Sequence, residues 1–154
     1  MRQLIIVRKD LNMSPGKLAV QVAHASNAFL LAKIKAAANK EEWKSEADDK
    51  IWSVYKAELT FSPEVYEKWI DDIYTKTVCE AKNKDKLLKV LDTAKELSLK
   101  ENIDYFIIKD YCLTELTPEE YDENGQGKVL TCIGFAPLDD ETSHKLSKRY
   151  QLYK

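Results

Sequence analysis

Three polar side chains that can do chemistry recur on one face of a predicted helix. Lys17, Gln21 and His24 are four and three residues apart, so a helix places them, together with Ala28, within an arc of about 60°. Apolar residues flank this stripe, and burying an amine, an amide and an imidazole together is unfavourable unless they have partners or a ligand. The spacing therefore indicates a binding or catalytic site on this face.

Each of these residues also has a purely structural interpretation. Taken singly, His24 is more often a core histidine bonded to a backbone carbonyl, and Lys17 is more often an exposed lysine at a helix start. Their position on one face favours a site. Gly16 lets the backbone turn into the helix, so that main-chain N–H groups and the Lys17 ammonium can converge on an anion. A phosphate or a developing oxyanion suits that place.

Charge is distributed unevenly along the chain, although the net charge is only -2. Residues 1–40 hold seven basic residues and one acidic residue, a net charge of +6, and residues 141–154 hold four and one, a net charge of +3. Residues 41–140 then carry −11. If the basic ends met on one face, they would form a positive patch suited to a phosphate backbone. A plain solvated surface is the alternative.

The pattern of apolar residues predicts the elements that position this site. Strands are predicted at 4–7, 74–81, 105–108 and 129–135, and helices at 17–38 and from residues 62, 83 and 139 onward. Strands that alternate with helices predict an α/β domain with at least one parallel crossover. We expect one mixed, mostly four-stranded sheet with helices on both faces. A longer helical connection is predicted at about residues 39–60, with Trp43 and Trp52 as apolar anchors.

The composition excludes several classes of protein. The apolar run at 4–7 is too short for an export signal, and charges interrupt every other apolar stretch before it could span a bilayer. Cys79, Cys112 and Cys132 are odd in number and lack a CxxC spacing, and with only two histidines neither disulfides nor a zinc site is indicated. We expect a cytoplasmic protein with no metal, no cofactor and no membrane partner.

The opening of the chain resembles the signature of the type 2 peptidyl-tRNA hydrolases, position for position. The residues that carry the resemblance are Arg8-x-Asp10-Leu11-x-Met13-x-x-Gly16-Lys17-x-Ala19-x-Gln21-x-x-His24-Ala25. The order of elements is similar to that family through to the closing strand with Ile133-Gly134 and the short helix after it. The resemblance covers nearly the whole chain and implies one domain over residues 1–154.

This resemblance implies a function and a set of site residues. The function is metal-independent hydrolysis of the ester of peptidyl-tRNA, which releases peptide and free tRNA, in a protein that binds tRNA and forms a homodimer. The implied catalytic residues are Lys17 and the Asp and Thr of the turn Asp110-Tyr111-Cys112-Leu113-Thr114, which corresponds to a family Asp-Ala-Gly-x-Thr. The implied substrate-binding residues are Gly16, Gln21, His24, Arg8 and Thr131.

The turn and the last strand depart from the family pattern. Cys112 stands where the family has Gly, and the loss of Gly restricts a positive φ at this position. Leu113 stands where an Arg is frequent. Val129 stands where Thr is common, although Thr131 points to the same strand face and can supply a hydroxyl. These departures support an alternative, a non-catalytic relative that binds tRNA or a protein partner.

Three aromatic residues lie between the first two predicted helices. Trp43, Trp52 and Tyr55 could stack on nucleic-acid bases, but aromatic residues at helical intervals are more often core anchors. We interpret them as structural.

Overall fold

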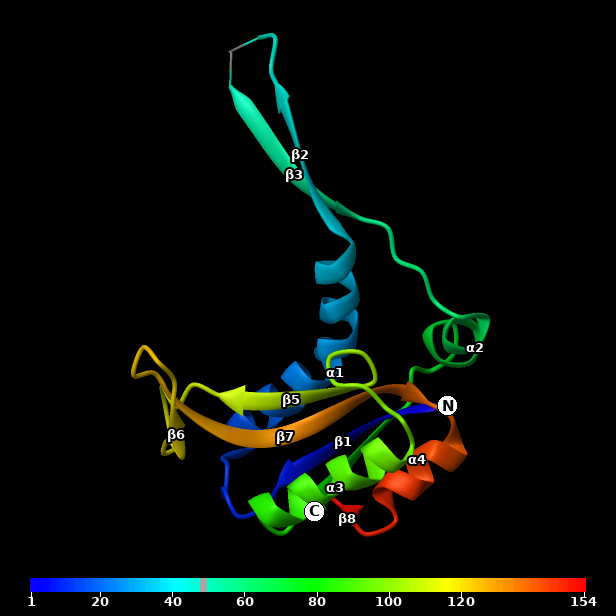
Figure 1. Ribbon diagram of the computed structural model, residues 1–154, viewed down its shortest axis with the longest axis vertical. Coiled ribbons are helices and arrows are strands. Elements are labelled where there is room, and N and C mark those ends of the chain that lie inside the picture. Colours follow the sequence, from blue (N-terminus) through cyan, green and yellow to red (C-terminus); the bar gives the residue numbers. More distant parts are fainter. Residues whose placement is uncertain (48–49) are drawn as a thin grey trace.

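The computed structural model describes residues 1–47 and 50–154 and forms one α/β domain around a mixed sheet (Figure 1). The sheet has the order β5-β7-β1-β4-β8, with β6 paired to β7. Its strands are β1 (Arg2–Arg8), β4 (Lys76–Ala81), β5 (Tyr105–Asp110), β6 (Glu120–Tyr121), β7 (Gly127–Leu138) and β8 (Gln151–Leu152). The helices are α1 (Pro15–Ala37), α2 (Pro63–Val65), a π-helical turn (Tyr66–Ile70), α3 (Lys84–Glu96) and α4 (Asp140–Ser147). Four main strands and the predicted α/β class are confirmed.

Helices cover both faces of the sheet, as predicted. Helix α1 lies on one face, and α3 and α4 lie on the other (Figure 1). Strand β1 is parallel to β4 and antiparallel to β7, so the run from β1 through α1 to β4 is the predicted parallel crossover. Residues 4–7 are all buried because a central strand covered on both faces exposes neither set of its side chains.

A glycine on β7 sets how closely α1 approaches the sheet. A Cβ at Gly134 would lie 2.7 Å from the carbonyl oxygen of Ala25, a distance that side chains essentially never tolerate. Gly134 therefore lets the backbone of α1 pack directly on β7. Ser14 caps this helix, because its Oγ accepts a hydrogen bond from the Lys17 N–H at 3.3 Å. Gly16 lies inside the first turn without a positive φ, so the expectation that it supplies the turn is wrong.

The predicted helical connection at about residues 39–60 is also wrong. The chain forms a β-hairpin there, β2 (Ala38–Lys44) and β3 (Ile51–Ala57), which continues from the end of α1 and projects from the domain (Figure 1). Residues 48 and 49 of this connection lie outside the described residues. The strands pair antiparallel with Trp43 opposite Trp52, and aromatic cross-strand pairs of this kind stabilise a hairpin.

The aromatic residues of the hairpin are not core anchors. Trp43 and Trp52 are 50% and 52% exposed, and Tyr55 is 72% exposed. The structural interpretation of these three side chains therefore fails, because the hairpin projects from the domain and leaves each of them at least half exposed (Figure 1). In the described part of the chain, no helix has both the length and the apolarity needed to cross a bilayer.

Candidate active site

The three predicted catalytic residues meet where β5 ends and α1 begins. Asp110 is the last residue of β5, Lys17 lies in the first turn of α1, and Thr114 lies on the loop that follows β5. The Lys17 Nζ is 2.7 Å from Asp110 Oδ2 and donates a hydrogen bond to Thr114 Oγ1 at 3.1 Å. The Lys17 and Asp110 side chains are 13% and 11% exposed, so the ion pair is sheltered but not sealed.

A buried amide and a buried hydroxyl stand behind this ion pair. Gln21 Nε2 donates to Asp110 Oδ2 at 2.8 Å, and Thr131 Oγ1 donates to Gln21 Oε1 at 2.7 Å. Because Thr131 donates to the amide oxygen, it fixes the Gln21 amide with its NH₂ toward Asp110. Gln21 and Thr131 are 1% and 0% exposed. Val129 is also buried, and it lies opposite Asp110 in the strand register.

The turn after Asp110 keeps a backbone conformation that favours glycine. Cys112 has a φ of 56°, and its N–H donates to Asp110 Oδ1 at 2.8 Å. A left-handed residue other than glycine costs about 1–2 kcal/mol. Cys112 therefore holds a strained conformation at the position where the family pattern has glycine, and its backbone N–H holds the second oxygen of Asp110.

A cavity of about 470 Å³ opens in front of the ion pair. It is lined by Lys17, His24, Ile108, Lys109, Asp110, Tyr111, Leu113 and Thr114. The His24 side chain is exposed and makes no hydrogen bond with the described residues, so it is not a core histidine. Gly16 is exposed at the start of α1, and nothing lies within 4 Å of the place where a Cβ would stand. The predicted stripe on α1 therefore faces the cavity at Lys17 and His24 and the protein interior at Gln21.

The start of α1 already holds a carboxylate of this chain. Glu115 accepts hydrogen bonds from the Ser14 N–H at 2.8 Å and from the Ser14 Oγ at 2.7 Å. These bonds hold the pKa of the Glu115 carboxyl below its usual value. The sequence analysis missed Glu115, and it lies 101 residues from its partner with no spacing that links them. The helix end that was expected to bind an anion is thus capped internally.

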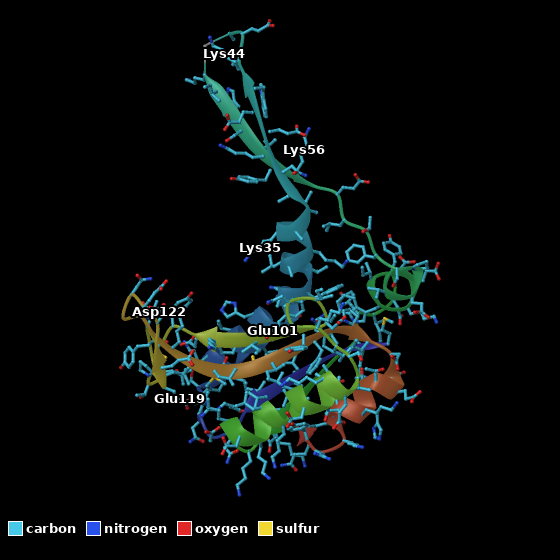
Figure 2. All side chains as sticks on the ribbon, viewed as in Figure 1. Lys35, Lys44, Lys56, Glu101, Glu119 and Asp122 are labelled. Carbon is cyan, nitrogen blue, oxygen red and sulfur yellow. The ribbon has the colours of Figure 1, made fainter. Side chains whose placement is uncertain are left out.

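Arg8, which was predicted to bind substrate, is buried and fully engaged. Its guanidinium pairs with Asp10 and Glu119, each at 2.7 Å, and donates to the Leu130 carbonyl at 3.1 Å. Lys84 also pairs with Glu119 at 3.0 Å. The hydrogen bonds from Arg8 lower the pKa of Glu119 to about 2. Arg8 does not line the cavity, but it anchors the end of the loop that carries Thr114 (Figure 2, where Glu119 is labelled).

The cysteine thiols are poor nucleophiles. Burial raises the pKa of Cys79 and of Cys112, and it raises the pKa of Cys132 to about 12. Neutral thiols neither attack an ester readily nor bind a metal ion. Within residues 1–47 and 50–154, no group of three or more His, Cys, Asp and Glu side chains is arranged to hold a metal ion.

Comparison with known proteins assigns this architecture to a family. A sequence model of the family described as "Peptidyl-tRNA hydrolase PTH2" matches residues 1–153. A protein of Methanopyrus kandleri named "Peptidyl-tRNA hydrolase" is 34% identical over 141 residues, which is 91% of this chain and 87% of that protein. A protein of the same name from Sulfolobus acidocaldarius is 30% identical, and the match covers 92% of this chain and 90% of that protein. Another from Thermococcus sibiricus is 27% identical, and the match covers 98% of this chain and 96% of that protein. The similarity thus extends over nearly the full length on both sides.

Proposed function

The chain belongs to the peptidyl-tRNA hydrolase PTH2 family, and from that premise we propose how its own residues hydrolyse the ester that joins a peptide to tRNA. The reaction releases the peptide and free tRNA. The observation that carries the proposal is the meeting of Lys17, Asp110 and Thr114 at the mouth of one cavity. Ester hydrolysis needs a positioned water and a group that stabilises the oxyanion, and these three side chains can supply both.

Lys17 is the group that stabilises the oxyanion. An ammonium has three N–H donors, and here two of them are directed at Asp110 and Thr114. The third remains for the ester carbonyl oxygen, on which negative charge develops in the transition state. Asp110 keeps the ammonium in place. An ammonium held by a carboxylate needs no reorganisation when that charge appears.

Asp110 and Thr114 position the attacking water. An ionised carboxylate offers about four lone-pair positions, and here Lys17, Gln21 and the Cys112 N–H occupy three of them. The remaining position and the Thr114 hydroxyl can hold one water against the ester carbon. The water oxygen bonds to that carbon and the carbonyl π electrons move to the oxygen held by Lys17. When this adduct collapses, the bond to the ribose oxygen breaks, and that oxygen takes a proton from the water and becomes the ribose hydroxyl. No covalent intermediate with the protein is required.

The other predicted site residues divide into two groups. His24 and Gly16 face open space, so they are suited to contact the terminal adenosine of the tRNA. Gln21 and Thr131 are buried and act through Asp110, so we assign them a positioning role. Arg8 supports the loop behind the site and makes no contact with substrate.

The setting of the protein completes the proposal. We place it in the cytoplasm, where charged tRNA is found, and we propose a homodimer. The outer face of α1 supports a dimer contact, because Val20, Leu31 and Ile34 are 48%, 47% and 40% exposed there. Light scattering after size-exclusion chromatography tests the dimer, since a mass of one chain at micromolar concentration would refute it.

The experiment that tests the catalytic proposal is release of peptide from an N-acyl-aminoacyl-tRNA in the presence of a chelator. We expect hydrolysis by the wild type and its loss in Asp110→Asn. The matched control is Asp122→Asn, because Asp122 also pairs with a lysine, Lys128 at 2.8 Å, but lies outside the cavity (Figure 2). Equal activity of both variants would refute the assigned site, and a wild type that binds tRNA without turnover would identify a non-catalytic relative.

A further inference from the structure

A basic groove lies outside the candidate active site, between α3 and the turn that joins α4 to β8. Its volume is about 630 Å³. Six cationic side chains line it: Lys9, Lys82, Lys86, Lys89, Lys148 and Arg149. Glu80 is the one carboxylate of its lining, so the groove carries a net charge of about +5 in a chain whose total charge is -2. Lys9 comes from the basic N-terminal segment and Lys148 and Arg149 from the basic C-terminal segment, whereas the other three cations come from the acidic middle of the chain.

Five of the six cations of the groove are available to bind a ligand. Lys9 pairs with Glu80 at 2.9 Å and lies over the Tyr153 ring. The other five are exposed and form no ion pair with the residues that the structure describes. Lysines that are not engaged can meet a polyanion without first breaking an internal ion pair. The groove is therefore equipped to attract repeated negative charges.

The walls of the groove are tied to each other. Tyr150 Oη donates to the Lys86 carbonyl at 2.8 Å, which joins the α4–β8 turn to α3. Gln151 Nε2 donates to Glu80 at 2.7 Å, which joins β8 to β4. Lys86 and Lys89 are three residues apart within α3, so they project from one side of that helix, and Lys82 precedes its N-cap Asn83. Hydrogen bonds thus hold the two walls of the groove together.

The groove and the candidate active site lie at the same edge of the sheet, with a second hollow beside the groove. Lys9 also lines a second hollow of about 370 Å³, together with Pro15 and Leu18. Those two residues flank Lys17, whose side chain lines the cavity with Asp110. The groove, the hollow and the cavity all lie at the edge of the sheet where β1, β4 and β5 end. A chain of phosphates can follow this edge from one to the other.

We propose that the basic groove binds the sugar–phosphate backbone of the tRNA acceptor arm while the ester lies at Lys17. This inference rests on the proposed function, because the groove would hold a second part of the same tRNA whose ester lies at Lys17. Neutralising phosphates releases counterions, so the groove contributes affinity that falls steeply with salt. It also discriminates a whole tRNA from a short ester, which cannot reach the groove.

The test compares two substrates in Lys86→Glu/Lys89→Glu. One substrate is N-acyl-aminoacyl-tRNA, and the other is the same ester on a CCA trinucleotide. For the tRNA we expect kcat/KM to fall at least about tenfold because KM rises. The slope of log(kcat/KM) against log(salt concentration) should become less steep by about 0.9 for each phosphate contact that is lost. Turnover of the trinucleotide should not change. Lys148→Glu/Arg149→Glu on the other wall repeats the test if the first variant fails to fold.

The matched control makes the same change of charge at the far end of the molecule. Lys35→Glu/Lys56→Glu alters the end of α1 and the hairpin, on the opposite side of the sheet from α3 (Figure 2). An equal loss in this control, or an equal loss on both substrates, would overturn the proposal. If the wild type cleaves neither substrate, the proposed function fails on its own. Binding of deacylated tRNA, measured by fluorescence anisotropy, then decides on the groove, since an unchanged Kd in the groove variant refutes it.

Discussion

Two ion-paired clusters at the same edge of the sheet are built from similar groups and do different things. Around Arg8, the guanidinium donates to Asp10, Glu119 and the Leu130 carbonyl through all three of its nitrogens, and the Arg8 side chain is only 4% exposed. Around Lys17, one ammonium N–H and one carboxylate position remain, and both face a cavity. A saturated cluster stabilises the fold, whereas an unsaturated one beside a cavity can act on a substrate.

Removing the Lys17 cation should produce the largest effect on activity. In Lys17→Ala we expect kcat to fall about 10³-fold, or about 4 kcal/mol of transition-state stabilisation, because the oxyanion loses its charged donor. The free energy of unfolding should fall by less than in Arg8→Met, because Gln21 and the Cys112 N–H still donate to Asp110. Single-turnover hydrolysis and urea denaturation measure the two quantities. A Lys17→Ala variant that loses stability but keeps a normal kcat would mean that the Lys17 cluster is structural, like the Arg8 cluster.

Removing the Arg8 cation should give the opposite pattern. Arg8→Met leaves Asp10 without its partner and Glu119 with Lys84 alone, and we expect a loss of about 2–3 kcal/mol in the free energy of unfolding. The folded fraction should keep kcat within about threefold, because the Lys17 pair is intact. Denaturation and kinetics at a temperature where the variant remains folded provide the test. A drop in kcat as large as that of Lys17→Ala would mean that Arg8 acts in the reaction.

The Arg8 cluster also predicts how stability depends on pH. The pKa of Glu119 is depressed to about 2 in the folded protein, so the stabilisation is present above about pH 4.5 and is lost as the pH falls from there toward 2. Between pH 7 and pH 3, the wild type should lose about 1–2 kcal/mol more than Glu119→Gln. Urea titrations at both pH values measure this difference, and parallel losses in the two proteins would contradict it.

The smallest expected effect concerns the strained turn beside Asp110. Cys112→Gly removes the strain of a side chain at a φ of 56° but makes the unfolded chain more flexible. We expect the free energy of unfolding to rise by up to about 1 kcal/mol as the net result of these two effects. Activity should be unchanged, because the Cys112 contact to Asp110 comes from the backbone N–H. Thermal denaturation checks this prediction. A clear loss of stability would show that packing of the thiol outweighs the strain.

Sequence reasoning succeeded where residues close in the chain also lie close in space. The run at 4–7 identified the central strand because it is apolar on both faces. The spacing of Lys17, Gln21 and His24 identified one stripe of α1, of which Lys17 and His24 line the cavity and Gln21 is buried. It also indicated that Thr131 could supply a hydroxyl. The partner of that hydroxyl depends on a register shift in β5 and β7 next to Ile108, which no sequence pattern reveals.

The failures have physical causes of the same kind. Glu115 caps α1 across 101 residues, and only the folded loop brings it to Ser14. The sequence predicts a helix where the hairpin lies, because a helical interpretation assumes buried aromatic residues, whereas Trp43 and Trp52 are exposed cross-strand neighbours. A pattern that reports burial cannot predict an element that is not buried.

The central claim is that Lys17 and Asp110 act as one unit, and a double-mutant cycle on peptide release tests it most directly. Chelator-treated Lys17→Ala, Asp110→Ala and the double variant would be compared on N-acyl-aminoacyl-tRNA. If Asp110 acts by holding Lys17 and the water, the double variant should be about as slow as the slower single variant, because groups that act together give strongly non-additive losses. Losses that multiply, or an Asp110→Ala variant with normal turnover, would contradict the account.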